Sequence, residues 1–172
     1  MSVPEAVSRY PLEWPIGWQR TPGHRRLRAN FSTKKTIDGR VTCREATVRL
    51  EAELDRLGAT TPVLSTHVTL RLDGSPRSDE EPRDPGAAVY FRFKGKAQVL
   101  ACDKWNRVAD NIAAMAAHID ALRRVDRYGV GTIEQALAGY KALPADTGGE
   151  LASCLRIRIG QSADARSGRG RV

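Results

Sequence analysis

Basic side chains and one tyrosine are the residues of this sequence whose types and order point most clearly to a ligand. Basic groups neutralise phosphates, and a tyrosine on an open sheet face stacks against an unpaired base. The pattern therefore favours nucleic acid as the ligand. The candidate nucleic-acid-binding residues are Arg25, Arg26, Arg28, Lys34, Lys35, Tyr90, Arg92, Lys94, Lys96, Lys104 and Arg107.

Catalytic arrangements have less support. A nuclease-like site would combine Asp103 and Lys104, at a predicted junction of strand and helix, with Asp73 or Glu45. Asp103 is explained more simply as the N-cap of the helix that follows it. His67 is the best-placed general base, but the sequence reveals no Ser, Cys or Asp partner for it. We therefore expect no enzyme activity.

Cofactor and metal motifs are absent from the sequence. It contains neither a Gly-x-x-x-x-Gly-Lys-Ser/Thr phosphate loop nor a Gly-x-Gly-x-x-Gly motif. Cys43, Cys102 and Cys154 are far apart, and no Cys-x-x-Cys pair occurs. This spacing argues against a zinc site and against a disulfide framework. We expect no cofactor and no metal, and we expect Cys43 and Cys102 to be small buried apolar residues.

The net charge of +8 is concentrated at the two ends of the chain. Residues 1–40 carry eight Lys or Arg against three acidic residues, and residues 151–172 carry five Arg against one Asp. Residues 41–150 are close to neutral, with 15 basic and 16 acidic residues. Basic ends on a neutral centre either engage nucleic acid or acidic partners, or serve as solubilising tails.

Length and apolar patterning predict a cytoplasmic protein. The 172 residues fit one domain with a core of its own. No apolar run approaches the roughly 20 residues that a membrane-spanning helix needs. The first residues also lack the charged start and apolar stretch of a secretory signal. We therefore expect no membrane partner.

The chain divides into three predicted parts. Residues 1–40 form an extended basic arm rich in Trp and Pro, because four prolines exclude an ordinary helix there. Residues 41–143 form an α+β core domain, and residues 144–172 a basic, largely disordered tail. Trp14 and Trp18 either anchor the arm on its own domain or contact a protein partner.

Helix signals flank a strand-rich centre. A capping box from Thr42 to Glu45 starts a helix that Gly58 ends. A second helix follows Asp103, its predicted N-cap, and a second capping box at Thr132 starts a short third helix. The apolar stripe of the second helix is Trp105, Val108, Ile112, Met115, Ile119 and Leu122.

Three strands are predicted between the first two helices. Residues 63–72 alternate with period two, and residues 87–93 and 97–102 flank a turn at Gly95. Residues 73–86, rich in proline, glycine and acids, are predicted to be a mobile loop. The expected fold is α+β: a three-stranded antiparallel sheet packed against two to three helices, in the order α-β-β-β-α-α, with an extended N-terminal arm.

The two faces of this predicted sheet differ. Val89, Phe91 and Phe93 share a parity and should face the core. The other face stays open unless the arm covers it. It would carry Tyr90 and Arg92 together with Ser65, His67, Thr69 and Arg71.

Three stretches of the sequence resemble a known family. They are Tyr10-Pro-Leu-Glu-Trp-Pro-Ile-Gly-Trp-Gln-Arg-Thr-Pro, the segment from Ala88-Val-Tyr-Phe to Val99-Leu-Ala-Cys-Asp-Lys-Trp-Asn-Arg-Val-Ala-Asp-Asn, and Tyr128-Gly-Val-Gly-Thr-Ile-Glu-Gln-Ala. On these stretches, residues 10–143 resemble the N-terminal module of J-domain-containing proteins of proteobacteria and their phages. Members commonly continue into a J domain, whose His-Pro-Asp tripeptide stimulates an Hsp70-type chaperone. This sequence contains no His-Pro-Asp, so the resemblance implies the module without the J domain.

Two functions follow as expectations. The first is a non-enzymatic nucleic-acid-binding accessory protein of a phage or mobile element. The alternative is a protein-interaction (adaptor) module of a J-domain co-chaperone family that has lost its J domain. In the alternative, Trp14 and Trp18 of the arm contact the protein partner.

Overall fold

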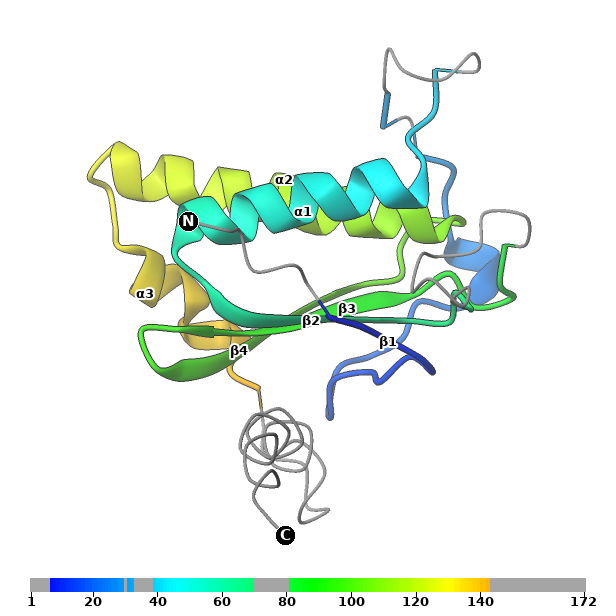
Figure 1. Ribbon diagram of the computed structural model, residues 1–172, viewed down its shortest axis with the longest axis horizontal. Coiled ribbons are helices and arrows are strands. Elements are labelled where there is room, and N and C mark those ends of the chain that lie inside the picture. The colour runs from blue at the N-terminus through cyan, green and yellow to red at the C-terminus, as the bar shows by residue number, and fades with distance from the viewer. Residues whose placement is uncertain (1–6, 30, 33–38, 70–80, 143–172) are drawn as a thin grey trace, which may run out of the picture.

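Two long helices lie side by side on one face of a four-stranded sheet in the computed structural model of the chain (Figure 1). The structure describes residues 7–29, 31–32, 39–69 and 81–142. In chain order the elements are β1 (Val7–Arg9), the 3₁₀ helix η1 (Gly23–Arg25), α1 (Cys43–Leu57), β2 (Thr60–Thr66), β3 (Ala87–Phe93), β4 (Lys96–Cys102), α2 (Val108–Arg127), α3 (Ile133–Leu137) and the 3₁₀ helix η2 (Ala138–Tyr140). No helix among these residues is long and apolar enough to cross a membrane.

Helix α1 begins and ends as its sequence predicts. The Thr42 hydroxyl accepts a hydrogen bond from the Glu45 N–H at 3.2 Å, and the Glu45 carboxylate accepts one from the Thr42 N–H. Gly58 closes the helix with a φ of 78°, in the left-handed region that favours glycine. The buried stripe of α1 is Ala46, Leu50, Leu54 and Leu57.

The predicted hairpin is also confirmed. Lys94 and Gly95 join β3 to β4 with φ values of 47° and 77°, the two positive angles of a type I′ turn. Val89, Phe91 and Phe93 are buried in the core beneath the helices, as their parity predicts. The capping box at Thr132 likewise starts α3, through the Gln135 side chain and N–H.

The predicted three-stranded antiparallel sheet is wrong, although the α+β class is confirmed. The sheet has four strands in the order β1-β2-β3-β4, and β1 pairs parallel with β2, with Val7 opposite Val63. Residues 7–9 thus belong to the sheet and not to a separate arm. Three residues are too few to give an alternating pattern, and the neighbouring prolines hid this edge strand from the sequence analysis.

Strand β2 lies earlier than its alternation predicted. It spans Thr60–Thr66 where the pattern indicated residues 63–72, and its pairing with β3 is irregular between Thr60 and Val63. Residues 70–72 and the predicted loop segment 73–80 lie outside the described residues. Leu64, Ser65 and Thr66 are all buried, so β2 has covered residues on both faces near its end.

Helix α2 starts later than predicted. It begins at Val108 after an N-cap at Arg107, so Trp105 precedes the helix and Asp103 does not cap it. The Val108 N–H donates to the Glu81 carboxylate at 2.6 Å instead. The rest of the predicted stripe packs in the core or against it: Val108, Ile112, Met115, Ile119 and Leu122.

The N-terminal arm covers the sheet face opposite α1 and α2 (Figure 1). The Glu13 N–H donates to the Ser65 hydroxyl at 2.7 Å, and the Ser65 hydroxyl donates to the Pro11 carbonyl at 3.3 Å. The Tyr90 hydroxyl donates to the Glu13 carbonyl at 3.1 Å. Burial is the main cause that raises the pKa of Tyr90 to about 12. The face expected to be open is therefore occupied by the chain itself.

Both arm tryptophans contact their own domain. The Trp14 indole N–H donates to the Trp18 carbonyl at 3.1 Å, and the Arg20 guanidinium lies 4.2 Å from the centre of the Trp14 ring. The Trp18 ring packs against Tyr140, with 5.9 Å between ring centres. The tryptophans therefore anchor the arm in this structure. The predicted tail, residues 144–172, lies outside the described residues.

Candidate nucleic-acid interface

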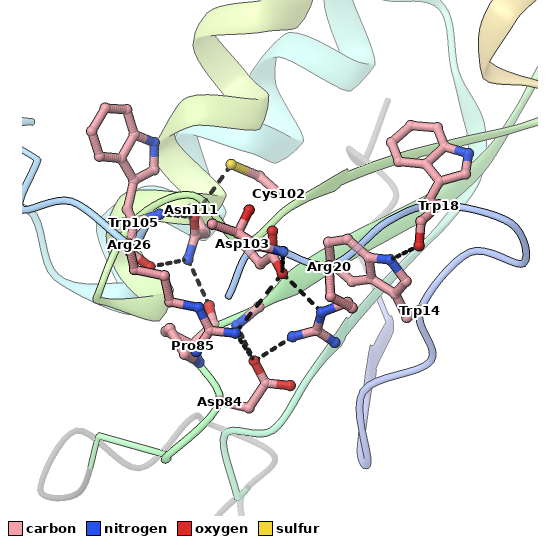
Figure 2. A network of polar contacts seen from close by, with 12 residues as sticks. Trp14, Trp18, Arg20, Arg26, Asp84, Pro85, Cys102, Asp103, Trp105 and Asn111 are labelled. Carbon is pink, nitrogen blue, oxygen red and sulfur yellow. Dashed lines mark hydrogen bonds and ion pairs between the residues drawn. The ribbon is translucent and has the colours of Figure 1, made fainter. Parts of the chain in front are cut away.

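Three segments far apart in the sequence meet where β3 begins and β4 ends (Figure 2). The Leu27 N–H donates to the Lys104 carbonyl at 2.9 Å, and the Asn106 N–H donates to the Leu27 carbonyl at 3.0 Å. These bonds lay the segment after η1 along residues 104–106. Asp84, just before β3, joins them through side-chain contacts with Arg20 and Arg26.

An ion-pair network ties these segments together (Figure 2). The Asp103 Oδ2 atom accepts from Arg20 Nε at 2.8 Å and from the Thr21 N–H at 2.9 Å. Arg20 Nη2 also donates to Asp84 Oδ1, and Arg26 Nη2 lies 3.2 Å from Asp84 Oδ1 and 3.8 Å from Asp103 Oδ2. Two arginines of the arm are therefore neutralised by two aspartates at the ends of strands.

This network replaces the predicted helix-capping role of Asp103. The side chain of Asp103 is buried, and its contacts with Arg20 and Arg26 account for that burial. The nuclease-like alternative gains no support, because Glu45 is engaged in the capping box of α1 and Asp73 lies outside the described residues. The pairing had no sequence signal, since its partners are separated by up to 83 positions.

Asp84 is held in its charged form. Partial burial raises the pKa of this carboxyl, but hydrogen bonds from Arg20 and the Gly86 N–H, with the charges of Arg20 and Arg26, outweigh that effect and lower it. His67 Nε2 lies 3.5 Å from Asp84 Oδ2. His67 thus has an aspartate beside it that the sequence did not reveal.

Asn111 lies beside the network and has a buried amide (Figure 2). Its Nδ2 group donates to the carbonyls of Pro85 at 2.7 Å, Trp105 at 2.9 Å and Arg107 at 3.2 Å. Its Oδ1 atom accepts from the Trp105 N–H at 3.0 Å and from the Cys102 thiol at 3.2 Å. One side chain therefore fixes the turn between β4 and α2 against the start of β3.

Residues 84–86, at the end of the predicted mobile loop 73–86, pack against the domain, which the sequence did not predict. Pro85 and Gly86 are buried. A Cβ atom on Gly86 would lie 2.9 Å from both Arg20 Nη2 and Leu12 Cδ2, so a larger residue would require these side chains to shift. The sequence analysis weighed the proline and acid content of this segment and missed its long-range contacts.

Four exposed cations each stand within two residues of a member of the network, and we call them the basic rim: Arg25, Arg28, Arg83 and Lys104. Arg25 and Arg28 flank Arg26, Arg83 precedes Asp84, and Lys104 follows Asp103. The Lys104 ammonium lies 5.0 Å from the centre of the Trp105 ring. Arg83 was missed by the sequence analysis, because it stands in a segment dominated by acids and prolines.

Three other candidate residues lie at the opposite end of the hairpin. Arg92 is exposed and donates to the Gly95 carbonyl at 2.9 Å, Lys94 is ion-paired with Glu134, and Lys96 is exposed. Five residue steps along β3 separate Arg92 from Ala87 at the start of the strand, a distance of about 17 Å. The predicted nucleic-acid-binding residues are thus divided between two ends of the sheet.

The remaining candidates are not on an open surface of the described residues. Tyr90 lies under the arm, and Arg26 is mostly buried in the network. The Arg107 guanidinium donates to the Val41 carbonyl at 3.2 Å and lies 3.8 Å from the buried carboxylate of Asp110. Lys34 and Lys35 lie outside the described residues.

Neither described cysteine has the character of a nucleophile. Burial is the main cause that raises the pKa of Cys43 to about 11, and burial also raises the pKa of Cys102. Both thiols therefore stay protonated at neutral pH. Each is partly buried against the core, close to the small apolar role predicted for it.

No protein-family model, curated protein or solved structure matches the chain. The resemblance of residues 10–143 to the N-terminal module of J-domain-containing proteins therefore stays a prediction from the sequence. The observations that bear on function are the basic rim and the ion-pair network beside it.

Proposed function

We propose that this chain is a non-enzymatic nucleic-acid-binding protein whose basic rim contacts the phosphate backbone. The observation that carries the proposal is the placement of Arg25, Arg28, Arg83 and Lys104 around one end of the sheet. Among the described residues, none of the four forms an ion pair, whereas Arg20 and Arg26 beside them are paired with aspartates. Cations without a carboxylate partner are the ones free to neutralise phosphates.

The rim is held on a firm scaffold. Its segments are joined by the backbone bonds of Leu27, by the Arg20–Asp103 contact and by the buried amide of Asn111. Because the backbone of these segments is held in place, ligand binding would have to order only the exposed side chains. The resemblance to a module of phage and bacterial proteins extends the proposal to an accessory role in a phage or mobile element.

Removing three rim charges should weaken binding to all nucleic-acid sequences alike. The variant combines Arg25→Gln, Arg28→Gln and Lys104→Gln. At low salt, about 50 mM, we expect its affinity for duplex DNA to fall at least about tenfold, and the salt slope to decrease by up to about three units. Fluorescence anisotropy with two unrelated oligonucleotide sequences over a range of salt concentrations measures both.

The matched control removes the same number of charges at the other end of the hairpin. It combines Arg92→Gln, Lys94→Gln and Lys96→Gln, at least about 17 Å along β3 from the end of the sheet where the rim residues stand. We expect this variant to bind within about threefold of the wild type, since screened charges at that distance contribute little. Equal losses in the two triple variants would contradict a phosphate-binding site at the rim.

A protein-interaction role is the second candidate, and one observation favours it. At the end of α2, Tyr128 and Val130 are 74% and 86% exposed, and Val125 beside them is also exposed. Exposed apolar clusters mark protein-interaction surfaces. Because Trp14 and Trp18 pack on the domain, an adaptor would use this cluster. The adaptor role would be favoured by two results together: the chain binds no nucleic acid, and the double variant Tyr128→Ser, Val130→Ser no longer binds a protein partner that the wild type binds.

A further inference from the structure

Three hydrogen-bond donors converge on the carboxylate of Asp84, and the ring of His67 lies beside it. Its Oδ1 atom accepts from Arg20 Nη2, from Arg26 Nη2 at 3.2 Å and from the Gly86 N–H at 3.2 Å. Its Oδ2 atom lies 3.5 Å from His67 Nε2. Two guanidinium groups, a ring nitrogen and a backbone amide thus surround a single anionic group, which is the donor set of an anion-binding site.

These donor side chains have hydrogen-bonding capacity that Asp84 and Asp103 leave unused. Arg26 Nε is buried and has no acceptor among the described residues. The side chains of Arg20, His67 and Asp84 are each about one-third exposed, so solvent reaches the cluster. A buried donor without a partner, next to a solvent-accessible anion, can serve a ligand with more acceptor atoms than a carboxylate has.

We propose that Arg20, Arg26, His67 and the Gly86 N–H form a phosphate seat that Asp84 fills while no nucleic acid is bound. This inference rests on the proposed nucleic-acid binding and names the group that the site accepts. Arginine forks bind carboxylates and phosphates with the same bidentate geometry, so one anion can replace the other. The exchange breaks and forms only ion pairs and hydrogen bonds.

The position of the seat fits a backbone that follows the basic rim. Arg26 stands between the rim residues Arg25 and Arg28, and Asp84 follows the rim residue Arg83. The seat therefore lies among the rim cations, and a nucleic-acid strand held by the rim would bring a phosphate next to it. The displaced carboxylate would leave Arg20 still paired with Asp103.

Emptying the seat should strengthen binding. We expect Asp84→Ala to raise the affinity for a 5′-hydroxyl oligonucleotide about tenfold at about 50 mM salt and to steepen the salt slope by about one phosphate contact. The matched control is Glu81→Gln, which removes one negative charge near the same site and keeps an oxygen for the Val108 N–H. We expect the control to change affinity by less than about twofold. Adding Arg20→Ala to Asp84→Ala should abolish the gain.

Inorganic phosphate gives a readout independent of nucleic acid. In the full chain, phosphate should raise the melting temperature of Asp84→Ala, because a ligand stabilises the folded state that binds it, and should raise that of the wild type much less. Asp84→Asn serves in place of Asp84→Ala if the latter does not fold. A 5′-phosphorylated oligonucleotide that binds Asp84→Ala more tightly than its 5′-hydroxyl form would identify a terminal phosphate as the occupant. Equal affinity of Asp84→Ala for the 5′-phosphorylated and 5′-hydroxyl oligonucleotides would identify a backbone phosphate as the occupant.

The failures of the two proposals are distinguishable. Equal gains in Asp84→Ala and Glu81→Gln, with no effect of phosphate on the melting temperature, would overturn the seat and leave rim binding intact. Stabilisation of Asp84→Ala by phosphate, in a chain that binds no oligonucleotide, would support the seat and contradict the proposed function.

Discussion

Asn111→Ala is expected to lower the free energy of unfolding by about 3–5 kcal/mol. The variant removes the donor to the carbonyls of Pro85, Trp105 and Arg107 and the acceptor for the Trp105 N–H. Each buried polar group left without a partner costs about 1–3 kcal/mol, less where water enters the cavity. Urea denaturation followed by circular dichroism measures the change.

Asn106→Ala is the matched control for Asn111→Ala. Asn106 lies five positions away in the same turn and is exposed, and its backbone N–H, not its side chain, bonds to Leu27 among the described residues. We expect this change to cost less than about 0.5 kcal/mol. If the two variants were equally stable, the Asn111 amide would not hold β3, β4 and α2 together, and the scaffold beneath the rim would need another explanation.

Ile119→Asp is expected to unfold the domain. Ile119 is fully buried in the apolar core where α2 packs on α1 and the sheet. The substitution removes the packing of the isoleucine side chain, and it buries a carboxylate away from water. Together these changes cost several kcal/mol. Since domains of this size are stable by only about 5–15 kcal/mol, we expect little cooperative thermal unfolding to remain.

Ala121→Asp is the control that measures the effect of an aspartate on α2 at an exposed position, without the effect of burial. Ala121 lies two positions further along α2 and is exposed. Its replacement should cost about 0.5–1 kcal/mol, from the lower helix propensity of aspartate. A melting temperature of Ile119→Asp equal to that of Ala121→Asp would mean that this face of α2 does not form the core.

Local patterns in the sequence predicted the elements that local interactions determine. The capping box at Thr42, the turn at Gly95 and the alternation of Val89, Phe91 and Phe93 each depend on residues a few positions apart. Elements that depend on distant contacts were missed or misplaced. Strand β1 exists because it pairs with β2, and α2 begins at Val108 because Glu81 accepts its N–H.

The candidate site was predictable only in part, for the same reason. The charges of Arg25, Arg28 and Lys104 identified them from the sequence as phosphate-binding candidates. The partners of Arg20 and Arg26 lie more than 55 positions away, and no sequence pattern links them. The contact of Tyr90 with the arm also depends on a long-range bond, from its hydroxyl to the Glu13 carbonyl, and no sequence pattern predicts it.

Salt-titrated binding of the full chain to nucleic acid tests the central claim most directly. Duplex DNA, single-stranded DNA and RNA would each be titrated by fluorescence anisotropy between about 50 and 300 mM salt. If the four rim cations contact phosphates, the logarithm of the binding constant for duplex DNA should fall linearly with the logarithm of salt, with a slope of about −3 to −4. No binding of any of the three at about 50 mM salt, where phosphate contacts are strong, would contradict the proposed function.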